Sequence, residues 1–108
     1  MTRERLSPEK RTRNILAVAI NLAIEHGYMN LTRHMISTAA GCSPALIHVY
    51  WATVEDLRKT VLRAAIRQGI YSIIAQGISV NDQETADLSA DLRYATSQWI
   101  AGGGHETI

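Results

Sequence analysis

Apolar positions recur at helical spacing along most of the chain, and no stretch shows the alternation of a half-buried strand. In the first helical stretch, SPEKRTRNILAVAINLAIEHG, one face carries Ile15, Ala19 and Leu22. This stretch opens with a Ser-Pro pair, which suits an N-cap and a first helical position, and it closes with a glycine. It therefore predicts a helix that begins after Ser7 and ends before Gly27.

Two short helices are expected next, joined by a sharp turn. Thr32 can cap the first and Ser43 the second, which begins at Pro44. Gly41 lies between them, and glycine adopts positive φ at little cost. Two short helices joined by a turn of three to four residues with glycine form a helix-turn-helix. Its internal contacts are expected from Ile36, Ala40, Cys42, Ile47 and Tyr50 or Trp51.

A long fourth helix is expected after the helix-turn-helix. Thr53 stands three residues before Asp56 in a variant of the capping box. An apolar face then continues past Gly69, which is read as a tolerated weak point, and the helix is expected to end near Gly77.

A fifth helix is expected from Asn81 and Glu84, which stand at capping-box spacing. Its apolar stripe consists of Leu88, Leu92, Ala95 and Trp99. The predicted fold class is all-α: a five-helix protein with an N-terminal three-helix helix-turn-helix head and a C-terminal two-helix dimerisation region. The head spans residues 1–53, with a basic arm at 1–7, the dimerisation region spans 54–101, and 102–108 form a frayed tail.

The basic residues are concentrated near the N-terminus. The first 59 residues hold eight of the eleven Lys and Arg residues but five of the ten Asp and Glu residues. This asymmetry favours a polyanionic partner for the N-terminal half, against the alternative of a solvated terminal face. Five of these cations lie within the first thirteen positions: Arg3, Arg5, Lys10, Arg11 and Arg13.

Several classes of function find no support in the sequence. Cys42 is the only cysteine, and the four histidines lack metal-ligand spacing, so no metal site is expected. No nucleophile–base constellation or phosphate-binding glycine loop is present, so we expect no enzyme activity and no cofactor. No apolar run approaches the roughly 20 residues that span a bilayer, and the N-terminus does not resemble a signal peptide. A cytoplasmic protein without membrane association is expected.

The third helix is the candidate DNA-reading element. Its inner side must pack on the first two helices, which leaves the other side free for the major groove of double-stranded DNA. The alternative is a helical hairpin without a ligand. The candidate base contacts are Ser43, Pro44, Ala45, His48 and Val49.

Residues 10–66 resemble the DNA-binding domain of the TetR family of transcriptional repressors. Eight residues fall in register with the family pattern without a gap: Thr32, Ile36, Ala40, Gly41, Ser43, Tyr50, Glu55 and Leu57. Four others are conservative replacements, in which Cys42 stands for Val, Ile47 for Leu, Trp51 for Phe and Thr53 for Ser. The resemblance implies a sequence-specific DNA-binding regulator that works as a dimer.

Three departures fall on positions that matter in this family. Ala45 replaces a glycine, His48 a tyrosine, and Val54 a lysine. In the family, that tyrosine and lysine commonly touch phosphates, and Val54 cannot. The candidate phosphate contacts are therefore Arg3, Arg5, Lys10, Arg11, Arg13, Thr32, Arg33, Tyr50 and Thr53.

The family usually carries a longer ligand-binding and dimerisation domain than the part of this chain after Ile66. We therefore expect a homodimeric repressor without a small-molecule inducer, of a kind that suits phage or other mobile elements. The candidate dimer interface is Ile70, Ile73, Ile74, Leu88, Leu92, Ala95 and Trp99. The alternatives are a truncated product and a protein-interaction module, such as an antirepressor or adaptor, on the same helices.

Overall fold

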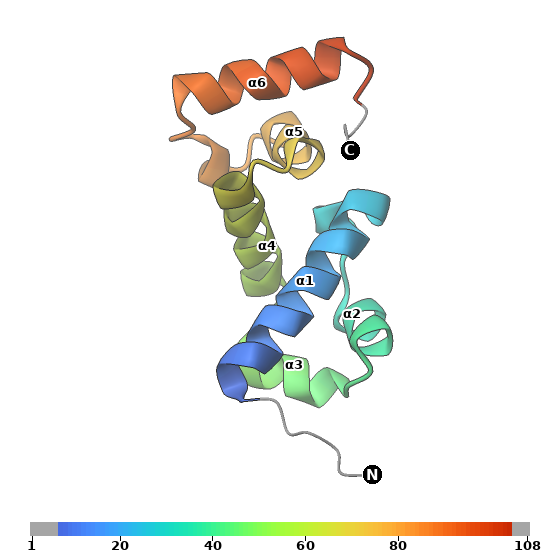
Figure 1. Ribbon diagram of the computed structural model, residues 1–108. Coiled ribbons are helices and arrows are strands. Elements are labelled where there is room, and N and C mark those ends of the chain that lie inside the picture. The colour runs from blue at the N-terminus through green and yellow to red at the C-terminus, as the bar shows by residue number, and fades with distance from the viewer. Residues whose placement is uncertain (1–6, 105–108) are drawn as a thin grey trace.

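The computed structural model describes residues 7–104, and these form an all-α fold (Figure 1). Two short 3-10 helices, η1 (Tyr28–Asn30) and η2 (Gln83–Thr85), interrupt the α-helical chain. The all-α prediction is confirmed for this part of the chain, whereas the layout of five helices is wrong. The α-helices are α1 (Pro8–His26), α2 (Arg33–Ala40), α3 (Pro44–Tyr50), α4 (Val54–Gln68), α5 (Tyr71–Ser79) and α6 (Ala90–Ala101).

The first three α-helices begin at the predicted caps. The hydroxyls of Ser7, Thr32 and Ser43 each accept a bond from the backbone N–H three residues on, at 3.1–3.3 Å. Gly41 ends α2 with a left-handed φ of 71°, and the N–H of Cys42 donates to the carbonyl of Ser37 at 3.0 Å. The turn between α2 and α3 is thus closed by backbone bonds that need a residue with positive φ at Gly41.

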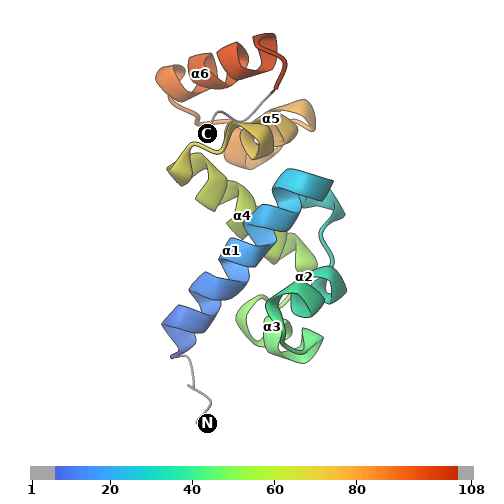
Figure 2. The same ribbon diagram turned by 45° about the vertical axis from the view of Figure 1, so that its right-hand side comes forward.

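The predicted fourth helix is in fact two helices. Gly69 takes a left-handed φ of 69° and ends α4 at Gln68. The N–H of Ile70 then donates to the carbonyl of Ala65 at 2.9 Å, which completes a Schellman motif. The chain restarts as α5 at Tyr71 and runs across the end of α4 (Figure 2). Gly69 is therefore a stop and not a weak point inside one helix.

The predicted start of the fifth helix is also wrong. Asn81 stands just after α5 and has a φ of 54°. This φ allows the N–H of Asp82 to donate to the carbonyl of Gly77 at 2.9 Å, which closes the end of α5. The carboxylate of Asp82 then caps η2. The last helix starts later, where the hydroxyl of Ser89 accepts the N–H of Leu92 at 3.1 Å.

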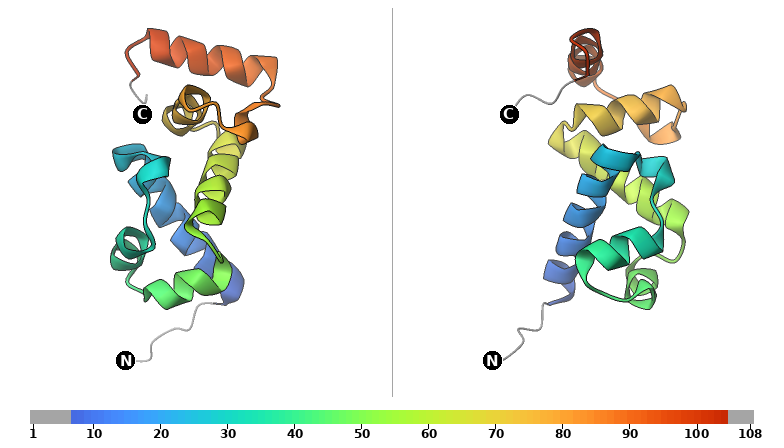
Figure 3. Two further views of the ribbon diagram at one scale, coloured as in Figure 1. Left: turned by 180° about the vertical axis from the view of Figure 1, so that it is seen from behind. Right: turned by 90° about the vertical axis from the view of Figure 1, so that its right-hand side faces the viewer.

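The main core lies among helices α1 to α4, and α5 adds Ile73 to it. Figure 3 shows α6 lying across α5, at the end of the molecule opposite α3. Helix α6 packs mainly against α5. The buried core residues are Ile15, Ala19, Ile20, Ala23, Tyr28, Leu31, Ile36, Ile47, Trp51, Leu57, Val61, Leu62, Ala64, Ala65 and Ile73.

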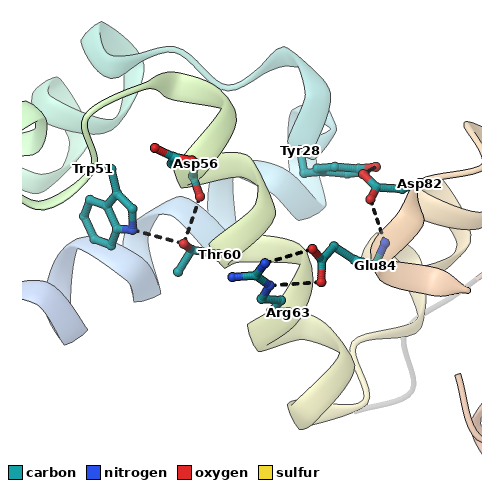
Figure 4. Close-up of polar contacts among 7 residues, drawn as sticks. All are labelled: Tyr28, Trp51, Asp56, Thr60, Arg63, Asp82 and Glu84. Carbon is teal, nitrogen blue, oxygen red and sulfur yellow. Dashed lines mark hydrogen bonds and ion pairs between the residues drawn. The ribbon is translucent and has the colours of Figure 1, made fainter. Parts of the chain in front are cut away.

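Polar contacts join α5 and η2 to the end of α1. The side-chain amide of Gln76 accepts the N–H of Tyr28 at 2.8 Å and donates to the carbonyl of Ala23 at 3.3 Å. The phenol of Tyr28 donates to Asp82 at 2.8 Å, and the two side chains face each other in Figure 4. Burial and then this carboxylate raise the pKa of Tyr28 well above its usual value, so the phenol stays a donor.

Candidate nucleic-acid interface

One side of helix α3 packs into the core. Ile47 is fully buried, and Trp51, which directly follows α3, is almost so. The indole N–H of Trp51 donates to the hydroxyl of Thr60 at 3.1 Å, and that hydroxyl donates to the carbonyl of Asp56 at 2.9 Å (Figure 4). The end of α3 is therefore tied to the first turns of α4, and the helix cannot rotate without breaking this chain of bonds. Ala40, Cys42 and Tyr50 pack against the same core, as the sequence predicts.

The other side of α3 is open to solvent. All five predicted base-contact residues are exposed: Ser43, Pro44, Ala45, His48 and Val49. Val49 is the most apolar of them, and its side chain is 74% exposed. The major groove of B-DNA is about 12 Å wide and admits a helix presented in this way. Small and apolar residues on such a helix suit contact with thymine methyl groups.

Two exposed threonines stand at the starts of α2 and α4. Thr32 accepts the N–H of Met35 at 3.1 Å, and Thr53 accepts the N–H of Asp56 at 3.0 Å. Each hydroxyl therefore acts as an acceptor for its helix and retains its own hydrogen, which can be donated to a phosphate oxygen. Tyr50, a further predicted phosphate contact, is half-buried with its ring edge-on to Trp51, at a centroid distance of 6.1 Å.

The basic residues of α1 point in different directions. Arg11 is half-exposed and lines a shallow pocket of about 140 Å³ with Gly41 and Leu46, so it lies beside the α2–α3 turn. Arg13 lines a separate groove that includes Gln68, at the far end of α4. Residues two apart on a helix do not share a face, which accounts for this divergence. Lys10 is exposed in the first turns of α1. The start of α1 lies at the same end of the molecule as α3 (Figure 2). Arg3 and Arg5 lie outside the described residues.

Two arginines donate to backbone carbonyls beside the helix-turn-helix. Arg33 Nη2 donates to the carbonyl of Ala52 at 2.7 Å, although the sequence places Arg33 among the phosphate contacts. Arg58 Nε and Nη2 donate to the carbonyl of Leu31 at 3.3 and 2.9 Å. Sequence reasoning missed the position of Arg58, because nothing near it in the sequence indicates a partner 27 residues away.

Acidic residues lie near the same surface. Glu55 and Asp56 are exposed in the first turn of α4, directly after Thr53, and Glu9 is exposed in the first turn of α1. Carboxylates stabilise the start of a helix through its dipole, but they repel phosphate. The start of α4 is thus a poor place for a close phosphate contact.

The predicted dimer residues are buried to different degrees. Ile73 and Ile74 are fully buried within one chain, so neither can contact a second chain in this arrangement. Ile70 is half-buried and packs on the core. Leu88 precedes α6, and it is half-buried together with Leu92, Ala95 and Trp99. Two large apolar side chains of α6 outside the predicted set are exposed, Tyr94 by 67% and Ile100 by 53%.

No helix between residues 7 and 104 is long and apolar enough to cross a bilayer. No group of three or more His, Cys, Asp or Glu side chains in the same range could hold a metal ion.

Comparison with protein families finds a match over part of the chain. Residues 15–61 match the family model described as bacterial regulatory proteins, tetR family. The matched segment begins within α1, contains α2 and α3, and ends within α4. No curated protein matches the chain. No solved structure matches it either.

Proposed function

We propose that this chain, whose residues 15–61 form a TetR-family DNA-binding domain, is a homodimeric, sequence-specific repressor that acts by occupying a promoter in the cytoplasm. The family match supports the coarser statement, a DNA-binding transcription regulator. Repression, sequence specificity and the dimer are the finer parts of the proposal. They rest on the arrangement of the described helices and on the general behaviour of helix-turn-helix proteins.

One observation carries the proposal. The open side of α3 presents five small, apolar or neutral polar residues together, while its other side is fixed by Ile47 and Trp51. The exposed cap Thr32 and the cations Lys10 and Arg11 support the proposal as candidate contacts to the DNA backbone. Base contacts provide specificity and phosphate contacts provide register, so both kinds of group are needed at one end of the molecule.

The direct test is selection from a pool of random duplex DNA with the full chain, followed by titration of the selected site. We expect a dissociation constant of about 10⁻⁸ M or below, at least roughly 10³-fold tighter than for unrelated DNA, with strong dependence on salt. A selected pool without a shared sequence, or equal affinity for all duplexes, would contradict sequence-specific recognition.

Two neighbouring arginines provide a matched pair of variants. Arg11 lies beside the α2–α3 turn, whereas Arg13 lies in the groove toward Gln68. We expect Arg11→Ala to weaken binding to all duplexes and to reduce the slope of log K against log salt by about 0.9, the amount for one phosphate contact. Arg13→Ala removes the same charge two residues away and should change the slope less. Equal effects would mean that the charges of α1 attract DNA collectively, and that the position of each side chain does not matter.

The dimer is proposed to form through the exposed side of α6. Tyr94 and Ile100 are large, apolar and exposed on a helix whose other side is covered by α5. A second copy of the chain is the proposed occupant, because a repressor of this type binds two half-sites about one DNA turn apart. Sedimentation equilibrium should give a dimer for the wild type and a weaker one for Tyr94→Ser with Ile100→Ser. A monomer at all concentrations would remove the dimer from the proposal.

A second candidate function is a protein-interaction module, and the acidic start of α4 favours it. Val54 supplies no phosphate contact, and Glu55 and Asp56 oppose one. If the selection fails and a stoichiometric protein partner is recovered whose binding requires Ala45 or His48, this function replaces the first.

A further inference from the structure

The segments that lead into α2 and α4 are tied to each other twice by arginines that cross in opposite directions. From the start of α2, Arg33 Nη2 donates to the carbonyl of Ala52 at 2.7 Å. From α4, Arg58 donates through two nitrogens to the carbonyl of Leu31 at 3.3 and 2.9 Å. Each arginine thus holds the backbone just before the helix that carries the other arginine. We call this arrangement the reciprocal brace.

The surroundings of Arg33 indicate that its guanidinium belongs to the fold. Its side chain is half-buried, and the Nε atom is buried without a hydrogen-bond partner among the described residues. The Nε edge of this guanidinium lies against the protein, and its Nη2 donates to a backbone carbonyl. Turning it outward to a phosphate would break the bond to Ala52. Lys10, by contrast, is exposed in the first turns of α1.

The reciprocal brace encloses the whole of α3. The chain from Arg33 to Ala52 contains α2, the turn and α3, so the bond between them closes a loop around the element that faces the groove. The two exposed caps lie directly beside the braced residues, since Thr32 separates Leu31 from Arg33 and Thr53 follows Ala52. The brace therefore sets the separation of two helix starts on either side of α3.

We propose that Arg33 and Arg58 are positioning residues for DNA recognition, which hold α3 between the caps of α2 and α4, and that Arg33 is not a phosphate contact. This inference rests on the proposed DNA-binding function, and it replaces the role that the sequence suggests for Arg33. It predicts that the loss of either arginine lowers the preference for the selected site while leaving the general attraction to DNA in place.

The first test measures affinity for unrelated and for selected duplex DNA across a range of salt concentrations. For Arg33→Ala we expect an unchanged salt slope on unrelated DNA and an affinity for the selected site lowered about tenfold or more. Arg33→Lys keeps the charge and the apolar stem but loses the planar fork, so it should not restore the selected-site affinity. Lys10→Ala is the control for a true phosphate contact, with a slope lower by about 0.9. A slope for Arg33→Ala that falls as for Lys10→Ala, with recovery in Arg33→Lys, would overturn the proposal.

The second test needs no DNA and uses amide hydrogen exchange of the full chain. Because the brace crosses, Arg33→Ala should speed exchange at the start of α4, at the N–H of Asp56 that Thr53 caps. Arg58→Ala should speed exchange at the start of α2, at the N–H of Met35 that Thr32 caps. We expect about a tenfold increase at each site, which corresponds to the loss of a charge-assisted bond. Arg67→Ala, on the exposed end of α4, is the matched control.

The two tests separate this inference from the proposed function. If the wild type shows no specific DNA binding, the proposed function fails, while the crossed exchange pattern still shows whether the brace exists. If the wild type binds its site but neither variant shows the crossed pattern, the brace is overturned and the proposed function stands. Melting of Arg33→Lys, which retains the buried stem, guards against mistaking global unfolding for local release.

Discussion

Helices α1–α4 and helix α6 bury their side chains to very different degrees. Helix α1 buries four residues and α4 buries five, all of them apolar, whereas the one buried residue of α6 is Thr96. The hydroxyl of Thr96 donates to the carbonyl of Leu92 within the same helix. The contrast indicates that α1–α4 carry their own stability, while α6 keeps apolar surface that burial against something else would stabilise.

The largest expected effect comes from one leucine in each region. Leu57 is fully buried in α4, and Leu57→Ala should lower the free energy of unfolding by about 2–5 kcal/mol. Leu92 of α6 is half-buried, so Leu92→Ala should cost less in dilute solution. Urea denaturation followed by circular dichroism measures both. If Leu92→Ala costs more as protein concentration rises, α6 gains burial from a second copy. Equal losses for the two variants at every concentration would contradict the difference in burial between α4 and α6.

The range of each interaction along the chain explains which parts of the fold the sequence predicts. The starts of α1, α2 and α3 depend on Ser or Thr hydroxyls that accept the backbone N–H three residues on. Such short-range capping can be predicted from the sequence. The sequence does not show that Gly69 and Asn81 end helices, because a glycine or an asparagine can also stand inside a helix or at a cap. The positive φ of each residue marks the end of a helix, and no local sequence pattern specifies it.

The candidate site also has one part that the sequence predicts and one part that it does not. Exposure of Ser43, Pro44, Ala45, His48 and Val49 follows from the helical period once Ile47 and Trp51 are placed inside, and it is confirmed. The partners of Arg33 and Arg58 lie 19 and 27 residues away, and those of Gln76 about 50 residues away. No local pattern specifies such contacts, because many residues of the same type are available to form them.

A smaller effect is expected at the junction between α4 and the last helices. A Cβ on Gly77 would lie 2.8 Å from Thr85 Cγ2 and 3.0 Å from Leu62 Cδ1, so Gly77→Ala should cost about 1–3 kcal/mol through overpacking. Gly69→Ala is the matched variant, since a Cβ there meets nothing within 4 Å but φ is 69°, and it should cost about 1–2 kcal/mol.

The two glycine variants should differ in where the damage appears. Hydrogen exchange should show that Gly77→Ala loosens α5 and η2 together, because the new methyl on α5 pushes against Thr85 of η2. Gly69→Ala should loosen the end of α4 and the start of α5, because only the backbone bonds of the turn are strained. Loss of protection in α1–α3 as well would mean that α5 and η2 are not separable from the rest, which would weaken the comparison.

The smallest effect is expected at the ion pair that connects α4 to η2. Arg63 Nε and Nη2 donate to the two carboxylate oxygens of Glu84, both at 2.9 Å (Figure 4). These bonds lower the pKa of Glu84, so the folded state favours its charged form. The resulting stability is present above the usual glutamate pKa of about 4.3 and is lost as pH falls through the lower folded value. The advantage of the wild type over Glu84→Gln should therefore shrink as the pH falls below the usual glutamate value of about 4.3.

Thermal melting at several pH values and two salt concentrations tests this ion pair. The wild-type advantage should be small and should fall with salt, because Arg63 is exposed and exposed ion pairs are screened. Asp87→Asn removes a negative charge three residues further along and controls for net charge. An advantage that grows as pH falls would have the wrong sign for a lowered carboxyl pKa, and η2 would then be held to α4 by Thr85 and its neighbours and not by charge. That outcome would sharpen the comparison, because packing and the hydrogen bonds of Gln76 and Asp82 would then connect α5 and η2 to the rest of the fold without the ion pair.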